Sequence, residues 1–182
     1  PQRNKPAGQR WRLDELQDEM LHCSISGALV SYSLSTQFDP LWSNLELSRK
    51  LAGYSGLFAI WNAMPAAGGE FPEPERFGVL MRENDVRAVA LHPVSNLWSL
   101  KAASSALLLR WLAREKVLTH LPRAELAGYE ELAWLLQTWP DLPVLLTGVD
   151  WRQQRQLIPL LTAHRNLHLA FDQFQIFQGL EY

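Results

Sequence analysis

The chain has 182 residues, of which 47% are hydrophobic and 20% are charged, and its formal net charge is −2. A charge this close to zero lacks the basic excess that binds nucleic acid or an anionic membrane, so we expect neither as a partner. The single cysteine, Cys23, excludes a disulfide within the chain and a cysteine-rich zinc site. A cytoplasmic location fits this cysteine usage, and no stretch is long and apolar enough to predict a membrane span.

The first part of the chain predicts a linker, a helix and a strand. Residues 1–10 are polar and basic, which is typical of a loop or linker, and residues 11–182 are expected to form one domain. Apolar residues then recur at helical spacing from Leu13 to Cys23, which predicts a buried, inert thiol on the apolar face of this helix. A short apolar run at residues 28–30 predicts the first strand.

Strands and helices alternate over the rest of the chain. Asp39 and Pro40 are typical of a helix N-cap followed by a proline in the first turn, and Gly53 is expected to end that helix. Apolar runs predict further strands at residues 57–61, 87–91, 117–119, 144–147 and 167–171. Amphipathic segments that fill the intervals between these strands predict helices.

Two of the predicted helices carry more detailed expectations. In the helix predicted at residues 100–116, Ala103, Leu107 and Trp111 are expected to form the buried face. Asp150 is expected to cap the helix that follows the fifth strand, and Pro159 within that helix must kink or restart it.

The order of elements predicts an α/β fold. About six β/α units with short connections are typical of a parallel sheet covered by helices, and continuous apolar strands indicate a sheet buried on both faces. An open doubly wound sheet and a closed barrel both satisfy this pattern. The glycine-rich phosphate-binding turn that open sheets often carry is absent from the sequence, which favours the barrel.

Several segments, taken in chain order, resemble the amidohydrolase-related (amidohydrolase 2 type) family of TIM-barrel proteins. No single segment is specific, but together they extend over nearly the whole chain. They are residues 13–20 (LDELQDEM), 27–32 (GALVSY), 44–46 (NLE), 86–93 (VRAVALHP), 141–148 (DLPVLLTG), 166–169 (NLHL) and 179–182 (GLEY).

The resemblance implies a (β/α)8 barrel with its active site at the carboxyl ends of the strands. It also implies hydrolysis or decarboxylation of a small amide, ester or cyclic substrate, assisted by a divalent metal such as zinc that activates a water. Such a family holds the metal with a His-x-His pair on the first strand, histidines on the fifth and sixth, and an aspartate after the eighth. The sequence has no His-x-His pair, and a complete barrel needs about 250 residues. We therefore expect an incomplete barrel that lacks the first and eighth strands and is inactive alone.

The same resemblance singles out the candidate site residues. His120 follows the strand that corresponds to the fifth of the family, which makes it the candidate metal ligand and a catalytic candidate. His92 and Asp172 also follow strands and are further catalytic candidates. Each has a structural alternative: His120 as a loop histidine bonded to backbone, His92 as a side chain that fixes its loop, and Asp172 as a turn cap.

Other positions depart from the family pattern. Ala90 stands where some relatives carry a lysine, and Thr147 and Gly148 stand where a metal-binding histidine is expected. Trp61, Trp98 and Trp151 lie at or near strand ends, where they could line a pocket or shield the barrel mouth from water.

Two functions remain open on this basis. The first is a metal-dependent hydrolase with a small-molecule substrate, and the alternative is a catalytically silent barrel that binds a ligand or a partner protein. An open sheet of unrelated function ranks below both. Because unpaired strand edges template further pairing, a barrel without its first and eighth strands is also expected to form homo-oligomers.

Overall fold

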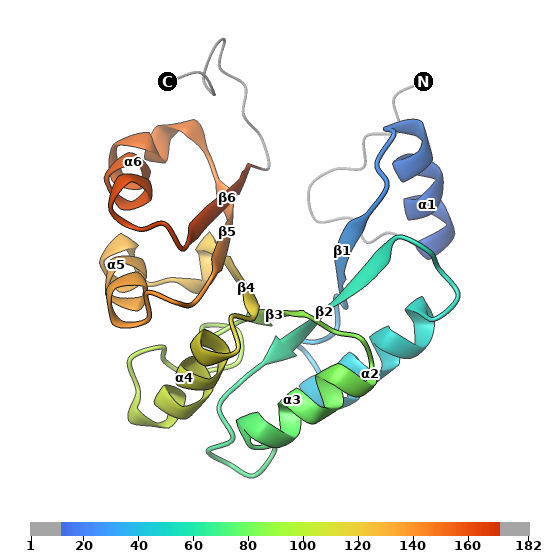
Figure 1. Ribbon diagram of the computed structural model, residues 1–182, viewed down its shortest axis with the longest axis horizontal. Helices are drawn as coiled ribbons and strands as arrows, with labels where there is room; N and C mark the ends of the chain where they lie inside the picture. The colour runs from blue at the N-terminus through green and yellow to red at the C-terminus, as the bar shows by residue number, and fades with distance from the viewer. Residues whose placement is uncertain (1–11, 172–182) are drawn as a thin grey trace.

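A computed structural model describes residues 12–171, so the linker predicted at residues 1–10 and the candidate Asp172 lie outside the described residues. The described part alternates strands and helices along its whole length (Figure 1). The helices are α1 (Leu13–His22), α2 (Pro40–Leu51), α3 (Pro74–Glu83), α4 (Ala106–Arg114), α5 (Tyr129–Thr138) and α6 (Gln154–Ala163). The strands are β1 (Ala28–Ser31), β2 (Leu57–Ala63), β3 (Ala88–Leu91), β4 (Leu118–Pro122), β5 (Val144–Val149) and β6 (Leu167–Phe171). Short 3-10 turns precede or follow some of them: η1 (Ala103–Ser105), η2 (Arg123–Glu125) and η3 (Trp151–Gln153).

The six strands form one sheet in the order β1-β2-β3-β4-β5-β6, and every neighbouring pair is parallel. The sheet curls, with the helices on its outer side, and β1 and β6 are its two edges (Figure 1). The predicted α/β fold is therefore confirmed as an incomplete parallel β/α barrel. None of the helices within residues 12–171 is long and apolar enough to cross a membrane.

The outer face of the sheet carries the main hydrophobic core. Trp61, Leu109, Leu135 and Leu146 are among the large side chains that become fully buried between the strands and the helices. Burying side chains of this size stabilises the fold by roughly 1.5–3 kcal/mol each, before the entropy of ordering them is subtracted. This packing explains why the strands are continuous apolar runs.

The inner face of the sheet carries fewer buried side chains than the outer face and is partly uncovered. Ile60, Ala88 and Ala90 form a second, small cluster there, separate from the main core. Nearer the amino ends of β1 and β2, Leu29 and Phe58 are paired across the strands and remain 44% and 53% exposed. A closed barrel would fill this face with side chains from strands on the opposite side.

Helix caps at two places agree with the sequence. The Asp39 carboxylate accepts a hydrogen bond from the Trp42 backbone N–H at 3.0 Å, and Pro40 opens α2. Asp150 accepts from the Arg152 backbone N–H at 2.8 Å and so caps the turn that leads into α6. Pro159 lies inside α6, which is assigned as one helix, so the proline does not restart it.

Four residues contradict the expectations about side-chain burial. Cys23 is exposed, because α1 ends at His22 and the cysteine caps the helix beyond its apolar face. Ala103 is exposed in η1, ahead of α4, and Leu107 is 59% exposed, because α4 begins only at Ala106 and buries the apolar stripe formed by Leu108, Leu109 and Leu112. Trp61 lines no mouth, since it is fully buried toward α2, where its indole N–H donates to Ser48 Oγ at 2.9 Å.

Candidate functional site

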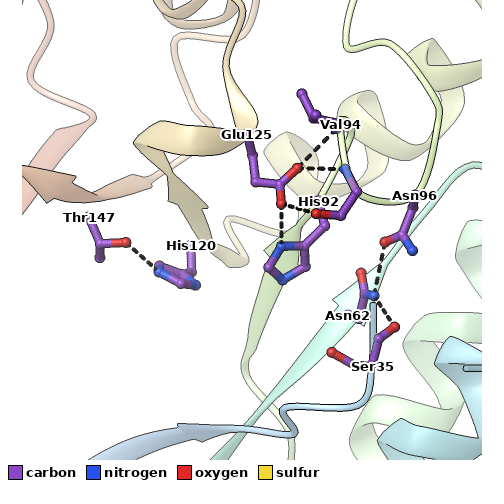
Figure 2. Close-up of polar contacts among 9 residues, drawn as sticks. Ser35, Asn62, His92, Val94, Asn96, His120, Glu125 and Thr147 are labelled. Carbon is purple, nitrogen blue, oxygen red and sulfur yellow. Dashed lines mark hydrogen bonds and ion pairs between the residues drawn. The ribbon is translucent and has the colours of Figure 1, made fainter. Parts of the chain in front are cut away.

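Polar side chains gather at the carboxyl ends of β2, β3 and β4, on the inner face of the sheet. Asn62, Ala90 and His120 lie at the same level, because Asn62 pairs with Ala90 and Ala90 pairs with His120. His92 follows Ala90 by two residues, so it continues the same face one step closer to the strand ends. Figure 2 shows the contacts of these side chains with the loops around them.

The imidazole of His92 contacts a buried carboxylate, Glu125, which lies on the turn η2 directly after β4. Its Nδ1 atom lies 3.3 Å from Glu125 Oε1, and the side chains of His92 and Glu125 are 15% and 9% exposed (Figure 2). Glu125 also accepts from the backbone N–H groups of Val94 and Ser95 at 2.9 and 3.0 Å, and from the Ser95 hydroxyl at 2.5 Å. One carboxylate on η2 therefore fixes both the ring of His92 and the loop that follows β3.

These hydrogen bonds decide the ionisation of Glu125 and the tautomer of His92. Burial raises the pKa of Glu125, but the hydrogen bonds from Ser95 and His92 outweigh burial and leave that pKa below its ordinary value of 4.5. An ionised carboxylate can only accept hydrogen bonds, so neutral His92 must carry its proton on Nδ1. The lone pair of Nε2 then remains available to take a proton or bind an electrophile.

The same pKa shift predicts how acid acts on the loop after β3. A carboxyl group with a lowered pKa in the folded state adds stability above its ordinary pKa, and that stability is lost as the pH falls through the folded value. The free energy of unfolding of the wild-type chain and of Glu125→Gln should therefore differ at pH 6 and converge well below pH 4.5. Urea denaturation over this pH range measures the difference. A gap between the two proteins that stays constant down to pH 3 would contradict the assignment.

A buried asparagine network holds the other side of the same loop. The backbone of Asn62 exchanges two hydrogen bonds with the Asn44 side chain on α2, both at 2.8 Å. The Nδ2 group of Asn62 donates to the Ser35 carbonyl at 2.8 Å and to Asn96 Oδ1 at 3.1 Å. The Asn96 backbone N–H in turn donates to the His92 carbonyl at 2.8 Å. The main chain of His92 is thus tied to β2 while its ring is tied to Glu125.

The second imidazole of the site is positioned by the neighbouring strand. His120 Nε2 lies 2.8 Å from Thr147 Oγ1 on β5 (Figure 2). The ladder between β5 and β6 shifts register between Leu146 and Val149, and Gly148 within this stretch has a φ of 70°, a conformation that favours glycine. Irregularities of this kind re-aim side chains at strand ends. Thr147 thus occupies the position where a histidine is expected and contacts His120 instead.

The described residues do not by themselves fit a metal centre. Within residues 12–171, no group of three or more His, Cys, Asp and Glu side chains is arranged to hold a metal ion. Hydrolytic zinc sites use about three protein ligands and a water. A metal bound through His120 would therefore need further ligands from outside this range.

The structure brings two of the three sequence-predicted site residues to one face. His92 directly follows β3, whereas His120 lies within β4 and not after it as predicted, because the strand continues to Pro122. Asp172 lies outside the described residues. Sequence reasoning missed Glu125 and Asn62. The signals available for them were a carboxylate and an amide in otherwise apolar segments at strand ends, where a buried polar group needs a partner or a function.

Comparison with solved structures agrees with a barrel fold. The chain is similar to an uncharacterised TIM-barrel protein from Bordetella bronchiseptica (TM-score 0.67, 14% identity, 87% of this chain and 58% of that one). It is also similar to a uronate isomerase from Bacillus halodurans (TM-score 0.57, 15% identity, 87% of this chain and 47% of that one). A third similar structure is a probable 2-pyrone-4,6-dicarboxylic acid hydrolase from Acinetobacter baumannii with citric acid bound (TM-score 0.59, 13% identity, 91% of this chain and 62% of that one).

The chain thus spans roughly half to three fifths of the length of these TIM-barrel structures. At this level of identity the likeness establishes the fold alone. No model of a protein family matches the sequence, and no match is found among curated proteins.

Proposed function

We propose that the intact protein is a hydrolase of the amidohydrolase-related TIM-barrel type, acting on a small amide, ester or cyclic substrate or decarboxylating a related compound. The observation that carries the proposal is the Glu125–His92 pair at the carboxyl ends of the strands, where barrel enzymes place their chemistry. An imidazole oriented by a carboxylate is the usual arrangement of a general base. The present chain, whose sheet has the two open edges β1 and β6, is proposed to be inactive alone and to form homo-oligomers through those edges.

The roles of the residues follow from their contacts. His92, with its proton on Nδ1, accepts a proton at Nε2 from the attacking water, and Glu125 stabilises the imidazolium that forms. His120 is held by Thr147 close to the same strand ends, where it can orient the substrate or donate a proton to the leaving group. Asp172 remains a proposed catalytic residue. A divalent metal such as zinc is proposed for the intact protein, where it would polarise the substrate carbonyl; His120 would then be one of its ligands instead of a proton donor.

One observation favours the alternative of a silent, ligand-binding barrel. Residues 12–171 offer no three-ligand metal group, and Ala90 and Thr147 occupy positions where ligands are expected from the family resemblance. A base held as firmly as His92 argues for chemistry, because a binding site has no need to fix one imidazole tautomer.

The test is hydrolysis of a panel of esters, amides and lactones by the intact protein and by three histidine variants. His92→Gln and His120→Gln should each lower kcat/KM by about 100-fold, the usual contribution of one general acid or base. His164→Gln is the matched control. His164 caps the end of α6 and precedes β6, so it lies at the amino ends of the strands, away from the carboxyl ends where the site lies. Full activity in both His92→Gln and His120→Gln would refute the site. An inactive wild-type protein that nevertheless binds panel members would favour the silent barrel.

A further inference from the structure

The 3-10 turn η2 carries two charged residues that face different neighbours. Glu125 faces the loop after β3, as described above. Arg123 faces the other way: its guanidinium lies over the Tyr129 ring at 4.8 Å, and Nη1 donates to the Leu126 carbonyl at 3.0 Å. Because η2 directly follows β4, Arg123 stands at the same carboxyl edge as His92 and His120.

The charge of Arg123 has no acidic partner in the described part of the chain. No ion pair within residues 12–171 includes it, and its Nε atom is buried without a hydrogen-bond acceptor from these residues. Two carboxylates of the same region, Glu125 on η2 and Asp150, whose charge acts on Tyr129, already accept other hydrogen bonds. Glu125 accepts hydrogen bonds from the β3 side, and Asp150 Oδ1 accepts from the Arg152 backbone.

Tyr129 cannot supply the missing negative charge. Burial raises the pKa of the Tyr129 phenol, the nearby Asp150 carboxylate raises it further, and Arg123 only partly opposes them. The phenol therefore stays neutral at physiological pH, and its O–H donates to Gln153 Oε1 at 2.7 Å. The ring provides a flat platform for the guanidinium and holds it in place without neutralising it.

A partly buried arginine without a counter-ion is costly, and it is relieved by an anion that the guanidinium can bind through two N–H groups. Arginine is better suited than lysine to such flat oxyanions as carboxylate and phosphate. We propose that Arg123 binds the oxyanion group of a small-molecule ligand at the carboxyl end of β4, so that the protein acts on an acid. The inference rests on the proposed function in one respect, namely that the ligand is the substrate whose reactive part lies over His92 and His120.

Binding of simple anions to the chain tests this site without any need for turnover. Malonate, inorganic phosphate and the neutral malonamide are titrated separately by isothermal calorimetry at constant ionic strength. Malonate or phosphate should bind in the millimolar range and malonamide should not. The anion that binds more tightly identifies the chemistry as carboxylate or phosphate.

The variants locate the site. Arg123→Gln should weaken binding at least about tenfold, and Arg123→Lys, which keeps the charge but loses the planar fork, should weaken it by a smaller factor. Arg110→Gln removes the same charge from the exposed side of α4 and should leave binding unchanged. Equal affinity of wild type and Arg123→Gln, or no binding of either anion by wild type, would overturn the inference. Anion binding without hydrolysis in the panel assay would leave the site intact and refute only the hydrolase.

Discussion

Glu125→Ala is expected to lower the free energy of unfolding by about 3 kcal/mol, because it leaves several buried donors without their acceptor and one unsatisfied buried donor costs about 1–3 kcal/mol. The carboxylate is 9% exposed and accepts hydrogen bonds from two backbone N–H groups, the Ser95 hydroxyl and the His92 ring. Alanine leaves all of these donors without their acceptor, and the loop after β3 must open to let water reach them. Urea denaturation followed by tryptophan fluorescence measures the loss.

Glu115→Ala is the control for this experiment. Glu115 caps the end of α4 and pairs with Arg114 at 2.8 Å, but its side chain is 41% exposed. Exposed ion pairs contribute about 0–1 kcal/mol, so this variant should unfold close to wild type. If Glu125→Ala costs no more than Glu115→Ala, the carboxylate does not hold the loop, and the proposed orientation of His92 loses its basis.

Gly78→Ala is expected to destabilise the chain by roughly 1–3 kcal/mol, although alanine is the better helix former. Gly78 lies inside α3, and a Cβ atom at this position would stand 2.4 Å from Cζ2 of Trp111 on α4. Trp111 is 5% exposed and packs edge-on against Phe77, so its ring has little room to move. The glycine is therefore the contact that lets α3 and α4 approach each other on the outer face of the sheet.

Gly53→Ala provides the matched comparison. A Cβ atom at Gly53 meets nothing within 4 Å, and its φ is not in the left-handed region. This variant should be neutral or slightly stabilising, because alanine restricts the unfolded chain. Thermal unfolding of both variants gives the comparison directly. Equal melting temperatures for Gly78→Ala and Gly53→Ala would mean that Trp111 moves aside and that the α3–α4 contact is loose.

The fold was accessible from the sequence because its pattern is strongly periodic. The apolar run at residues 167–171 predicts β6 at its observed bounds, and the capping chemistry of Asp39 predicts the start of α2. The prediction is wrong where two apolar stripes compete on one segment, as in α4, where periodicity predicts Leu107 on the buried face that Leu108 and Leu109 occupy. Sequence periodicity does not decide such cases, because the direction from which the sheet approaches is a property of the tertiary structure.

The site was accessible only in part. His92 and His120 could be picked out because each follows a predicted strand, and strand ends meet at one edge of a parallel sheet. Glu125 could not be assigned, because it lies 33 residues from His92 and meets it only after β3 and β4 have paired. The Thr147 contact likewise depends on the register of β4 against β5.

The orientation of His92 is the claim on which the proposed chemistry depends most directly. Long-range proton–nitrogen NMR correlations of the imidazole, recorded at a pH where the ring is neutral, distinguish a proton on Nδ1 from one on Nε2. The wild-type chain should show His92 with its proton on Nδ1, and Glu125→Gln should shift the population toward the other tautomer, because the amide no longer requires a donor. A wild-type His92 protonated on Nε2 would contradict the account, since the nitrogen proposed to act as the base would then carry the proton.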